Sequence, residues 1–246
     1  MPRISRNGWI AITAMAVVIV SVLALFFVPL VLSQKPSNQT TKTSSPTSTG
    51  THLIQLSSDP YTDPASQHQT EVEPGSFAFD STIVTAFQAG RFSAAGSSNI
   101  GWATSTDGGM TWQHGFLPGT TKVAGGPFDR ITDPSVAYDA AQNTWMIATT
   151  VFVYTSTGIV VPAVVVSLST NGGTVWSRPV TIANVGNVGE LDKDWIACDD
   201  TATSRFYGNC YAEWDNYARG NLIQMSTSLL QITAVQVGVA RPLWLP

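Results

Sequence analysis

The stretch Ser105–Trp112 reads STDGGMTW, a polar turn with two adjacent glycines that a tryptophan closes. A second copy, STNGGTVW, follows later in the chain at Ser169–Trp176. A polar turn of this kind, repeated along a chain, is typical of repeat proteins built from β-hairpins. The stretch therefore predicts an architecture, and it does not by itself indicate an activity.

Each residue type in this stretch has a physical role in a tight turn. An aspartate accepts hydrogen bonds from backbone N–H groups that the turn leaves unpaired, and glycine adopts positive φ without a steric cost. A tryptophan buries a large ring between sheets. We therefore expect a structural role for both copies, which consist of Ser105, Asp107, Gly109, Thr111, Trp112, Ser169, Asn171, Gly173 and Trp176.

Around the two turns, the chain repeats with a period of about sixty residues. Short apolar runs end in Asp80, Asp139 and Asp199, and Glu73-Pro74 before the first run matches Asp133-Pro134 before the second. Segments rich in β-branched and aromatic residues alternate with Gly, Asn, Asp and Ser turns, which is typical of strands. Four antiparallel strands per repeat is the design of a propeller blade.

The first period illustrates the strand prediction. We expect strands at 76–79, 82–88 and 99–104, and a fourth strand that starts near Trp112. The globular part, 53–228, then forms about three blades of four antiparallel strands. The predicted fold class is all-β.

The composition agrees with an all-β fold and argues against a nucleic-acid-binding protein. Of the 246 residues, 43% are hydrophobic and only 11% are charged, which suits a strand-rich globular protein. The net charge is −4, and no basic run follows the N-terminus. We therefore expect no nucleic-acid partner.

The N-terminal region has a different character. Arg3 and Arg6 precede the uncharged run 9–32, which at about 1.5 Å per residue is long enough to cross a hydrocarbon core of roughly 30 Å. Residues 1–33 are thus expected to be a signal anchor, a single transmembrane helix with its N-terminus inside and the C-terminal domain outside the cell membrane. A cleaved signal peptide and secretion stay open as the alternative.

A Ser/Thr/Pro-rich stalk, 34–52, follows the anchor. It has no large apolar residue and is expected to be disordered, because it cannot bury enough surface to offset its ordering entropy.

The turn Ser105–Trp112, its copy and their place between the third and fourth predicted strands resemble the sialidase-like (neuraminidase, BNR or Asp-box) β-propeller family. The resemblance covers about 71–227 and implies a partial propeller. It also implies a substrate site on the rim opposite the box turns, where the loops between second and third strands and the connections between blades lie. Sialidases need an arginine cluster that clamps the substrate carboxylate, a carboxylic acid/base, and a tyrosine nucleophile that a glutamate activates.

The candidate catalytic residues follow from this resemblance. They are Arg91 and Arg130 for the arginine cluster, Asp133 for the acid, and Tyr211 with Glu213, two positions apart on one predicted strand. A structural or solvated-loop role stays the alternative for each of them.

The cysteines and acidic residues allow two further predictions. Cys198 and Cys210 fall on adjacent predicted strands and are a disulfide candidate in an exported protein, with two free buried thiols as the alternative. No metal site is expected, since the histidines show no ligand spacing. Calcium is the one cofactor considered, at Asp192, Asp194, Asp199 and Asp200, although their spacing matches no calcium loop.

The repeat set is incomplete. At Ser228, where a third box is expected, Leu229-Leu230-Gln231-Ile232 replaces the polar glycine-rich turn. We interpret 229–246 as an atypical tail, out of frame with a longer gene, and expect the fragment to be inactive on its own.

Two function hypotheses remain. The first is an exported, glycan-directed exo-glycosidase of sialidase type in its full-length form. The second is a non-catalytic extracellular propeller that binds glycan or a surface protein.

Overall fold

A computed structural model describes residues 53–186, 189–218 and 226–232. The expected anchor at 9–32, the stalk and the tail beyond Ile232 lie outside these residues. In the part of the chain that the structure describes, no helix has the length and apolar character needed to cross a membrane.

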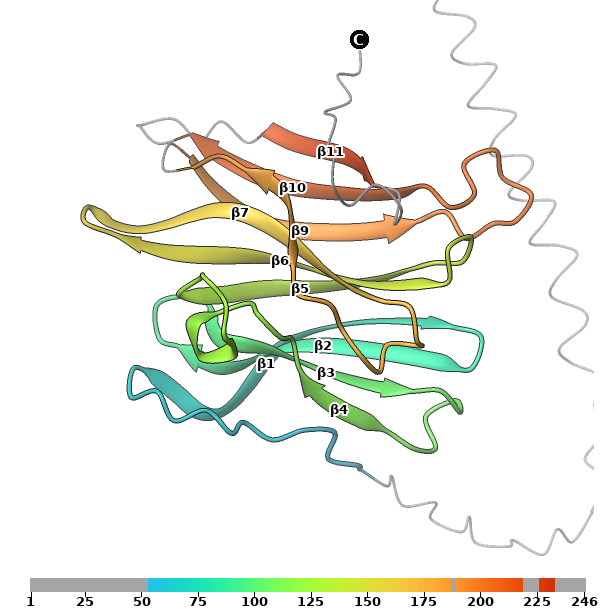
Figure 1. Cartoon of the computed structure of the whole chain (residues 1–246), viewed down its shortest axis with the longest axis horizontal. Coiled ribbons are helices and arrows are strands. Elements are labelled where there is room, and N and C mark those ends of the chain that lie inside the picture. The colour runs from blue at the N-terminus through green and yellow to red at the C-terminus, as the bar shows by residue number, and fades with distance from the viewer. Residues whose placement is uncertain (1–52, 187–188, 219–225, 233–246) are drawn as a thin grey trace, which may run out of the picture. The chain divides into compact units, whose positions relative to one another are not determined.

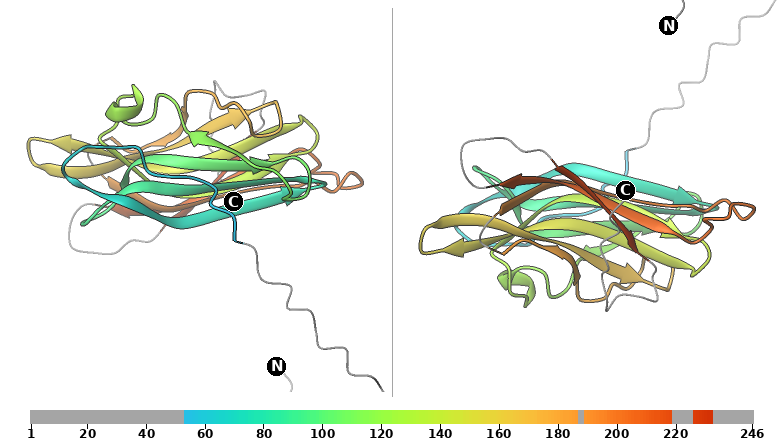
Figure 2. Two further views of the ribbon diagram at one scale, coloured as in Figure 1. Left: turned by 90° about the horizontal axis from the view of Figure 1, so that it is seen from below. Right: turned by 90° about the horizontal axis from the view of Figure 1, so that it is seen from above.

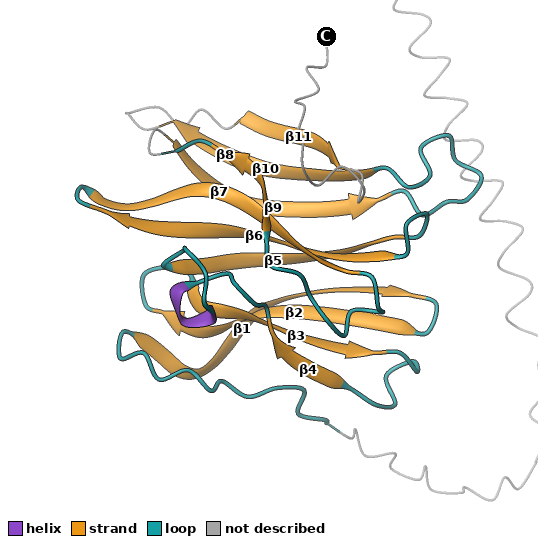
Figure 3. Ribbon diagram, viewed as in Figure 1, coloured by secondary structure: helices purple, strands orange, loops and turns teal. Residues whose placement is uncertain are grey.

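The described chain is all-β, and every strand pairing is antiparallel, which confirms the predicted class (Figure 1). One short 3₁₀ helix, η1 (Lys122–Ala124), stands out from one face of the strands as the green coil of Figure 2. Figure 3 shows how little of this part is helical. The strands, in chain order, are β1 (Ser66–Phe79), β2 (Thr82–Phe92), β3 (Ser97–Ser105), β4 (Gln113–Phe116), β5 (Arg130–Asp139), β6 (Thr144–Thr155), β7 (Gly158–Ser169), β8 (Val180–Asn184), β9 (Gly189–Cys198), β10 (Cys210–Ala218) and β11 (Ser226–Ile232).

These strands form three meanders, β1–β4, β5–β8 and β9–β11, in which consecutive strands pair. The first two meanders are joined in one sheet by a single residue pair, Ser97 with Ile131. The third meander forms a separate sheet. The first strands of the meanders are β1, β5 and β9. Each of them pairs along its length with the strand that follows it, β2, β6 or β10.

Strand alternation places the core on both faces of the second meander. Ile147 and Val165 point into a cluster shared with the first meander, which also contains Trp102 and Trp176. Their sequence neighbours Met146 and Val164 point the other way, into a cluster with Leu191, Ile196 and Trp214 of the third meander. Because successive side chains of a strand face opposite sides, β6 and β7 need apolar residues at nearly every position.

The turn Ser105–Trp112 is held by its own side chains. The Asp107 carboxylate accepts hydrogen bonds from the Thr111 hydroxyl at 2.6 Å, the Thr111 N–H at 2.9 Å and the Ser105 hydroxyl at 2.8 Å. These bonds lower the pKa of Asp107 to about 2, and the bond from the Thr111 hydroxyl contributes most. The Trp112 indole N–H donates to the Gly109 carbonyl at 3.0 Å.

The second turn repeats this geometry with one bond fewer. Asn171 accepts from the Val175 N–H at 3.0 Å and the Ser169 hydroxyl at 2.8 Å, but Val175 has no hydroxyl to donate. The Thr104 hydroxyl of β3 donates to the Gly173 carbonyl at 2.7 Å. The second turn is thereby attached to the first meander.

The other strand ends differ from the sequence prediction. β1 begins at Ser66, well before the expected 76, because a bulged segment continues its pairing with β2. β4 has only four residues. β11 runs through Ile232 and so extends past the expected boundary at Ser228.

The predicted disulfide is present. It links Cys198 and Cys210, which oppose each other on β9 and β10.

The close approach of β1 to β5 yields a test of the fold. A Cβ at Gly75 would lie 2.5 Å from the Pro134 carbonyl oxygen, so the two backbones touch where only glycine fits. We expect Gly75→Ala to lower the free energy of unfolding by about 1–3 kcal/mol in urea denaturation. Exposed Ser76 provides the control, since Ser76→Ala should stay within about 0.5 kcal/mol of wild type. Equal stability of both variants would show that the strands do not meet there.

Candidate functional site

The first strands of the three meanders carry the same irregularity at the same place. On each of β1, β5 and β9, two residues oppose a single residue of the partner strand, which defines a β-bulge. The bulged pairs are Glu73-Pro74, Asp133-Pro134 and Lys193-Asp194. Their first members have positive φ, 54° at Glu73, 50° at Asp133 and 49° at Lys193. Non-glycine residues rarely adopt this left-handed backbone conformation. Its recurrence at three positions, each sixty residues from the next, marks a repeated and strained feature.

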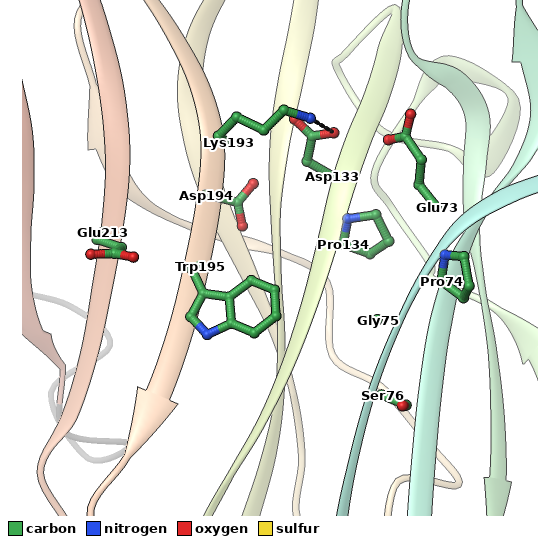
Figure 4. Close-up of a pocket in the computed structure, with 10 residues that line it drawn as sticks. All are labelled: Glu73, Pro74, Gly75, Ser76, Asp133, Pro134, Lys193, Asp194, Trp195 and Glu213. Atoms are coloured by element: carbon green, nitrogen blue, oxygen red, sulfur yellow. Dashed lines mark ion pairs between the residues drawn. The ribbon is translucent and has the colours of Figure 1, made fainter. Parts of the chain in front are cut away.

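The three bulges open onto one cleft. Its volume is about 590 Å³, and it lies across β1, β5 and β9 with a contribution from β10 (Figure 4). Its lining residues are Glu73, Pro74, Gly75, Ser76, Asp133, Pro134, Lys193, Asp194, Trp195 and Glu213.

Asp133 is the electrostatic centre of this cleft. Its carboxylate lies 3.5 Å from the Lys193 ammonium, the dashed contact of Figure 4. The charge of Asp133 is the main reason why the pKa of Lys193 is raised. The pKa of Glu73 is raised first by burial and then by its hydrogen bond with Asp133 and by the charge of Asp133. Burial, and then the Asp133 charge, also raises the pKa of Asp192.

Asp194 is the buried carboxyl of the cleft. Only 4% of the residue is exposed, and burial raises its pKa to about 8, with a smaller contribution from the Asp133 charge. The Thr150 hydroxyl donates to one carboxyl oxygen at 2.6 Å, and the Ser135 hydroxyl lies 3.3 Å from the other. At neutral pH, Asp194 therefore holds a proton beside the charged Asp133.

Trp195 supplies an apolar surface next to these carboxyl groups. It is 57% exposed although it is a large aromatic residue, and it stands directly opposite Glu213 of β10. An exposed indole beside several hydrogen-bond acceptors suits a flat ligand that has one apolar face and polar edges. A carboxyl group that retains its proton beside a carboxylate can act in proton transfer.

The structure brings together only some of the sequence-predicted catalytic candidates. Asp133 and Glu213 both line the cleft. Arg91 instead donates to the Phe92 and Gly96 carbonyls, at 2.6 and 3.1 Å. The hydroxyl of Tyr211 contacts Asn209 at 3.3 Å, near the start of β10.

Arg130 is also held outside the cleft. Its guanidinium donates to the Tyr154 hydroxyl at 2.6 Å and to the Ala95 carbonyl at 2.9 Å, and it lies 4.0 Å from the centre of the Phe92 ring. Phe92 and Tyr154 lie at the ends of β2 and β6, and Ala95 lies in the loop that follows β2.

The residues that sequence reasoning did not select as catalytic are Glu73, Lys193, Asp194 and Trp195. The comparison of the three repeats in the sequence indicates this position. Glu73-Pro74 and Asp133-Pro134 match, and the same position in the third period has Lys193-Asp194, where an acid replaces a proline. A polar residue that breaks a repeat at a buried position is a candidate for function.

The aspartates considered for calcium do not form one group. Asp192 and Asp194 belong to the cleft strand, whereas Asp199 and Asp200 lie in the β9–β10 loop. There, Asp199 accepts from Ser204 and Asp200 accepts from the Ala140 N–H. Among the residues that the structure describes, no three His, Cys, Asp or Glu side chains are arranged to hold a metal ion.

Comparisons with known proteins give similarities of structure and none of sequence. No family model matches the chain, and no curated protein matches it. The Hadza microbial sialidase Hz136 superposes with a TM-score of 0.49 at 14% identity, over 66% of this chain and 35% of that one. Zg3597, a family 117 glycoside hydrolase from Zobellia galactanivorans, superposes with a TM-score of 0.45 at 14% identity, over 70% and 55%.

A third solved structure, the Trypanosoma rangeli sialidase in complex with the inhibitor DANA, superposes with a TM-score of 0.47 at 13% identity, over 70% of this chain and 30% of that one. The chain thus spans less than two thirds of the length of each of these proteins. All three TM-scores lie below 0.5, so the chemistry of the cleft rests on its own residues.

The raised pKa of Asp194 predicts a pH-dependent stability. The carboxyl titrates near 8 in the folded protein and near its ordinary value of 3.8 when unfolded. Between these values the folded state binds a proton that the unfolded state has released, so this contribution to stability falls as the pH rises from about 4 to about 8.

The test compares wild type with Asp194→Asn in urea unfolding at pH 5, 6.5 and 8. Asparagine cannot ionise, so we expect the variant to gain stability relative to wild type across this range. Glu190→Gln, at an exposed position of the same strand, should show no such trend. A stability difference between wild type and Asp194→Asn that is constant with pH would contradict the assignment.

Proposed function

We propose that the cleft is the sugar-binding and proton-transfer site of a glycan-directed glycoside hydrolase. The observation that carries the proposal is a buried, protonated Asp194 beside the Asp133 carboxylate and next to the exposed Trp195. Glycoside hydrolysis commonly uses two carboxyl groups, one protonated and one ionised, on either side of the bond that breaks. We further propose that the meanders are blades of a sialidase-like β-propeller with Asp-box turns.

In this proposal the two acids of adjacent strands divide the reaction. The Asp194 proton passes to the glycosidic oxygen as the bond to the sugar carbon breaks. A water molecule gives its proton to Asp133, and its oxygen forms the new bond to that carbon. Asp194 is then a buried anion, which the Thr150 and Ser135 hydroxyls can stabilise because both already donate toward it. Asp133 then releases its proton to solvent, and Asp194 takes one up from solvent.

Trp195 orients the substrate in this scheme. One face of a pyranose ring is made of C–H groups and packs on an indole, while its hydroxyls reach the carboxylates at the edge. The same surface also supports the second function, a non-catalytic glycan-binding module, since stacking requires no proton transfer.

The proposed function also requires that the β-domain reaches glycans outside the cell. We propose that residues 9–32 anchor the chain in the cell membrane and that the β-domain faces outward, where surface glycans occur. The exo-sialidase form of the activity requires a carboxylate-binding arginine, and the described lining of the cleft contains none.

The proposal is tested with the full chain in detergent micelles and a panel of aryl glycosides. Asp194→Asn should lower kcat about 10²–10⁴-fold and leave binding in place, because it removes only the proton donor. Trp195→Ala should weaken binding about tenfold, the loss of one stacking contact of about 1.4 kcal/mol.

Phe206→Ala is the matched control, since Phe206 is an exposed aromatic outside the cleft. Binding without turnover by wild type would favour the binding module. No binding, or equal effects of the Trp195 and Phe206 variants, would refute the site.

A further inference from the structure

We propose, on the basis of the function proposed above, that the cleft takes a sugar unit without negative charge and rejects sialic acids and uronic acids. Three features of the cleft support a neutral substrate: the balance of its charges, the position of the arginines, and the polarity of the surface around Trp195.

The charges of the cleft disfavour an anion. Three carboxylic residues besides buried Asp194 line it, Glu73, Asp133 and Glu213, and Lys193 is the only cation in its described lining. The Lys193 ammonium is already paired with Asp133 at 3.5 Å. An acidic sugar entering here would meet like charges, and because Glu73 and Glu213 are exposed, this repulsion is strongest at low salt.

The charge of Asp133 also acts on its acidic neighbours. Burial comes first in raising the pKa of Glu73 on β1 and of Asp192 on β9, the Asp133 charge raises both further, and the charges of Lys193 and, at Glu73, of Arg91 act in the opposite direction. The carboxylate of a sialic or uronic acid would experience the same field.

The arginines that could reverse this balance are engaged elsewhere. Arg91 is held by the backbone carbonyls of Phe92 and Gly96, and Arg130 by the Tyr154 hydroxyl, the Ala95 carbonyl and the Phe92 ring. A bidentate clamp on a carboxylate needs a guanidinium that is free to face it. To turn either arginine into the cleft would break these contacts.

The remaining surface matches an uncharged sugar. Carboxylates accept hydrogen bonds and do not donate them, so they suit the hydroxyl donors of a neutral hexose. Glu213 stands opposite Trp195, and an acceptor therefore lies at the edge of the proposed stacking platform.

The first experiment is a glycan array probed with the labelled full chain in micelles, with Trp195→Ala as the background. The glycans that lose signal in the variant define ligands of the cleft. We expect this set to consist of glycans with neutral terminal sugars. A set dominated by sialylated or uronic-acid termini would overturn the inference and leave the proposed glycan site standing. No Trp195-dependent ligand of any kind would overturn both.

Calorimetry on a matched pair then isolates the charge. Lactose and sialyllactose, or a methyl hexoside and the uronide with the same ring, differ mainly in one carboxylate. We expect the neutral member of the pair to bind at least about tenfold more tightly at low salt, with a smaller ratio at high salt as screening increases.

Glu213→Gln keeps the size of the side chain and removes one charge, so it should narrow the ratio in favour of the acidic ligand. Phe206→Ala should leave the ratio unchanged. An acidic member that binds as tightly as its neutral partner would contradict the inference, as would a ratio that does not respond to Glu213→Gln.

Discussion

The proposed site depends on one backbone constraint, the left-handed conformation of Glu73, Asp133 and Lys193. Each such residue costs of order 1–3 kcal/mol and persists only where its surroundings over-determine it. Here the surroundings are visible. Gly75 packs against the Pro134 backbone, and Lys193 pairs with Asp133. The three bulges and their contacts support one another across three strands that are far apart in sequence.

The bulges change what the strands present. In a regular strand, alternate residues face alternate sides, and a bulge shifts this phase by one position. In the first two meanders the second bulged residue is proline, which has no N–H to leave unpaired. In the third meander it is Asp194. The same backbone device thus places a buried carboxyl where the other two repeats have an inert ring.

The two core clusters explain why the cleft can sit among β1, β5 and β9. The second meander is buried on both faces, so its tryptophan and aliphatic side chains fix the first and third meanders on either side of it. The turns at Ser105–Trp112 and Ser169–Trp176 terminate strands of these meanders and contribute no residue to the described cleft. Their part in the site is indirect, through the sheets that they close.

Much of the fold was accessible from sequence, because it rests on local patterns. The period near sixty and the enrichment in β-branched and aromatic residues predicted the all-β class, and the aligned runs before Asp139 and Asp199 correspond to β5 and β9. The site was accessible only in part. Asp133 and Glu213 were named, but the placement of loops on the predicted rim also selected Arg91 and Arg130, whose carbonyl, hydroxyl and ring partners come together only in the folded chain.

The residues missed in the site share one physical cause. Glu73, Asp194 and Trp195 face the cleft because a bulge shifts the strand, and alternation in a single sequence assumes that no shift occurs. Tyr211 and Glu213 are separated for a different reason. Both lie on the regularly paired part of β10 and face the same side, but Tyr211 opposes Ala197, farther from the bulge than Trp195, and of the two only Glu213 lines the cleft.

The most direct test of this account is an NMR titration of the Asp194 side-chain carboxyl in the full chain and in Asp133→Asn. If the three bulged strands form one cleft, Asp194 titrates near pH 8 in wild type and at a lower pH in the variant, since the Asp133 charge contributes to the shift. A midpoint near 4 in both proteins would mean that Asp194 is neither buried nor beside Asp133, and the proposed site would not exist.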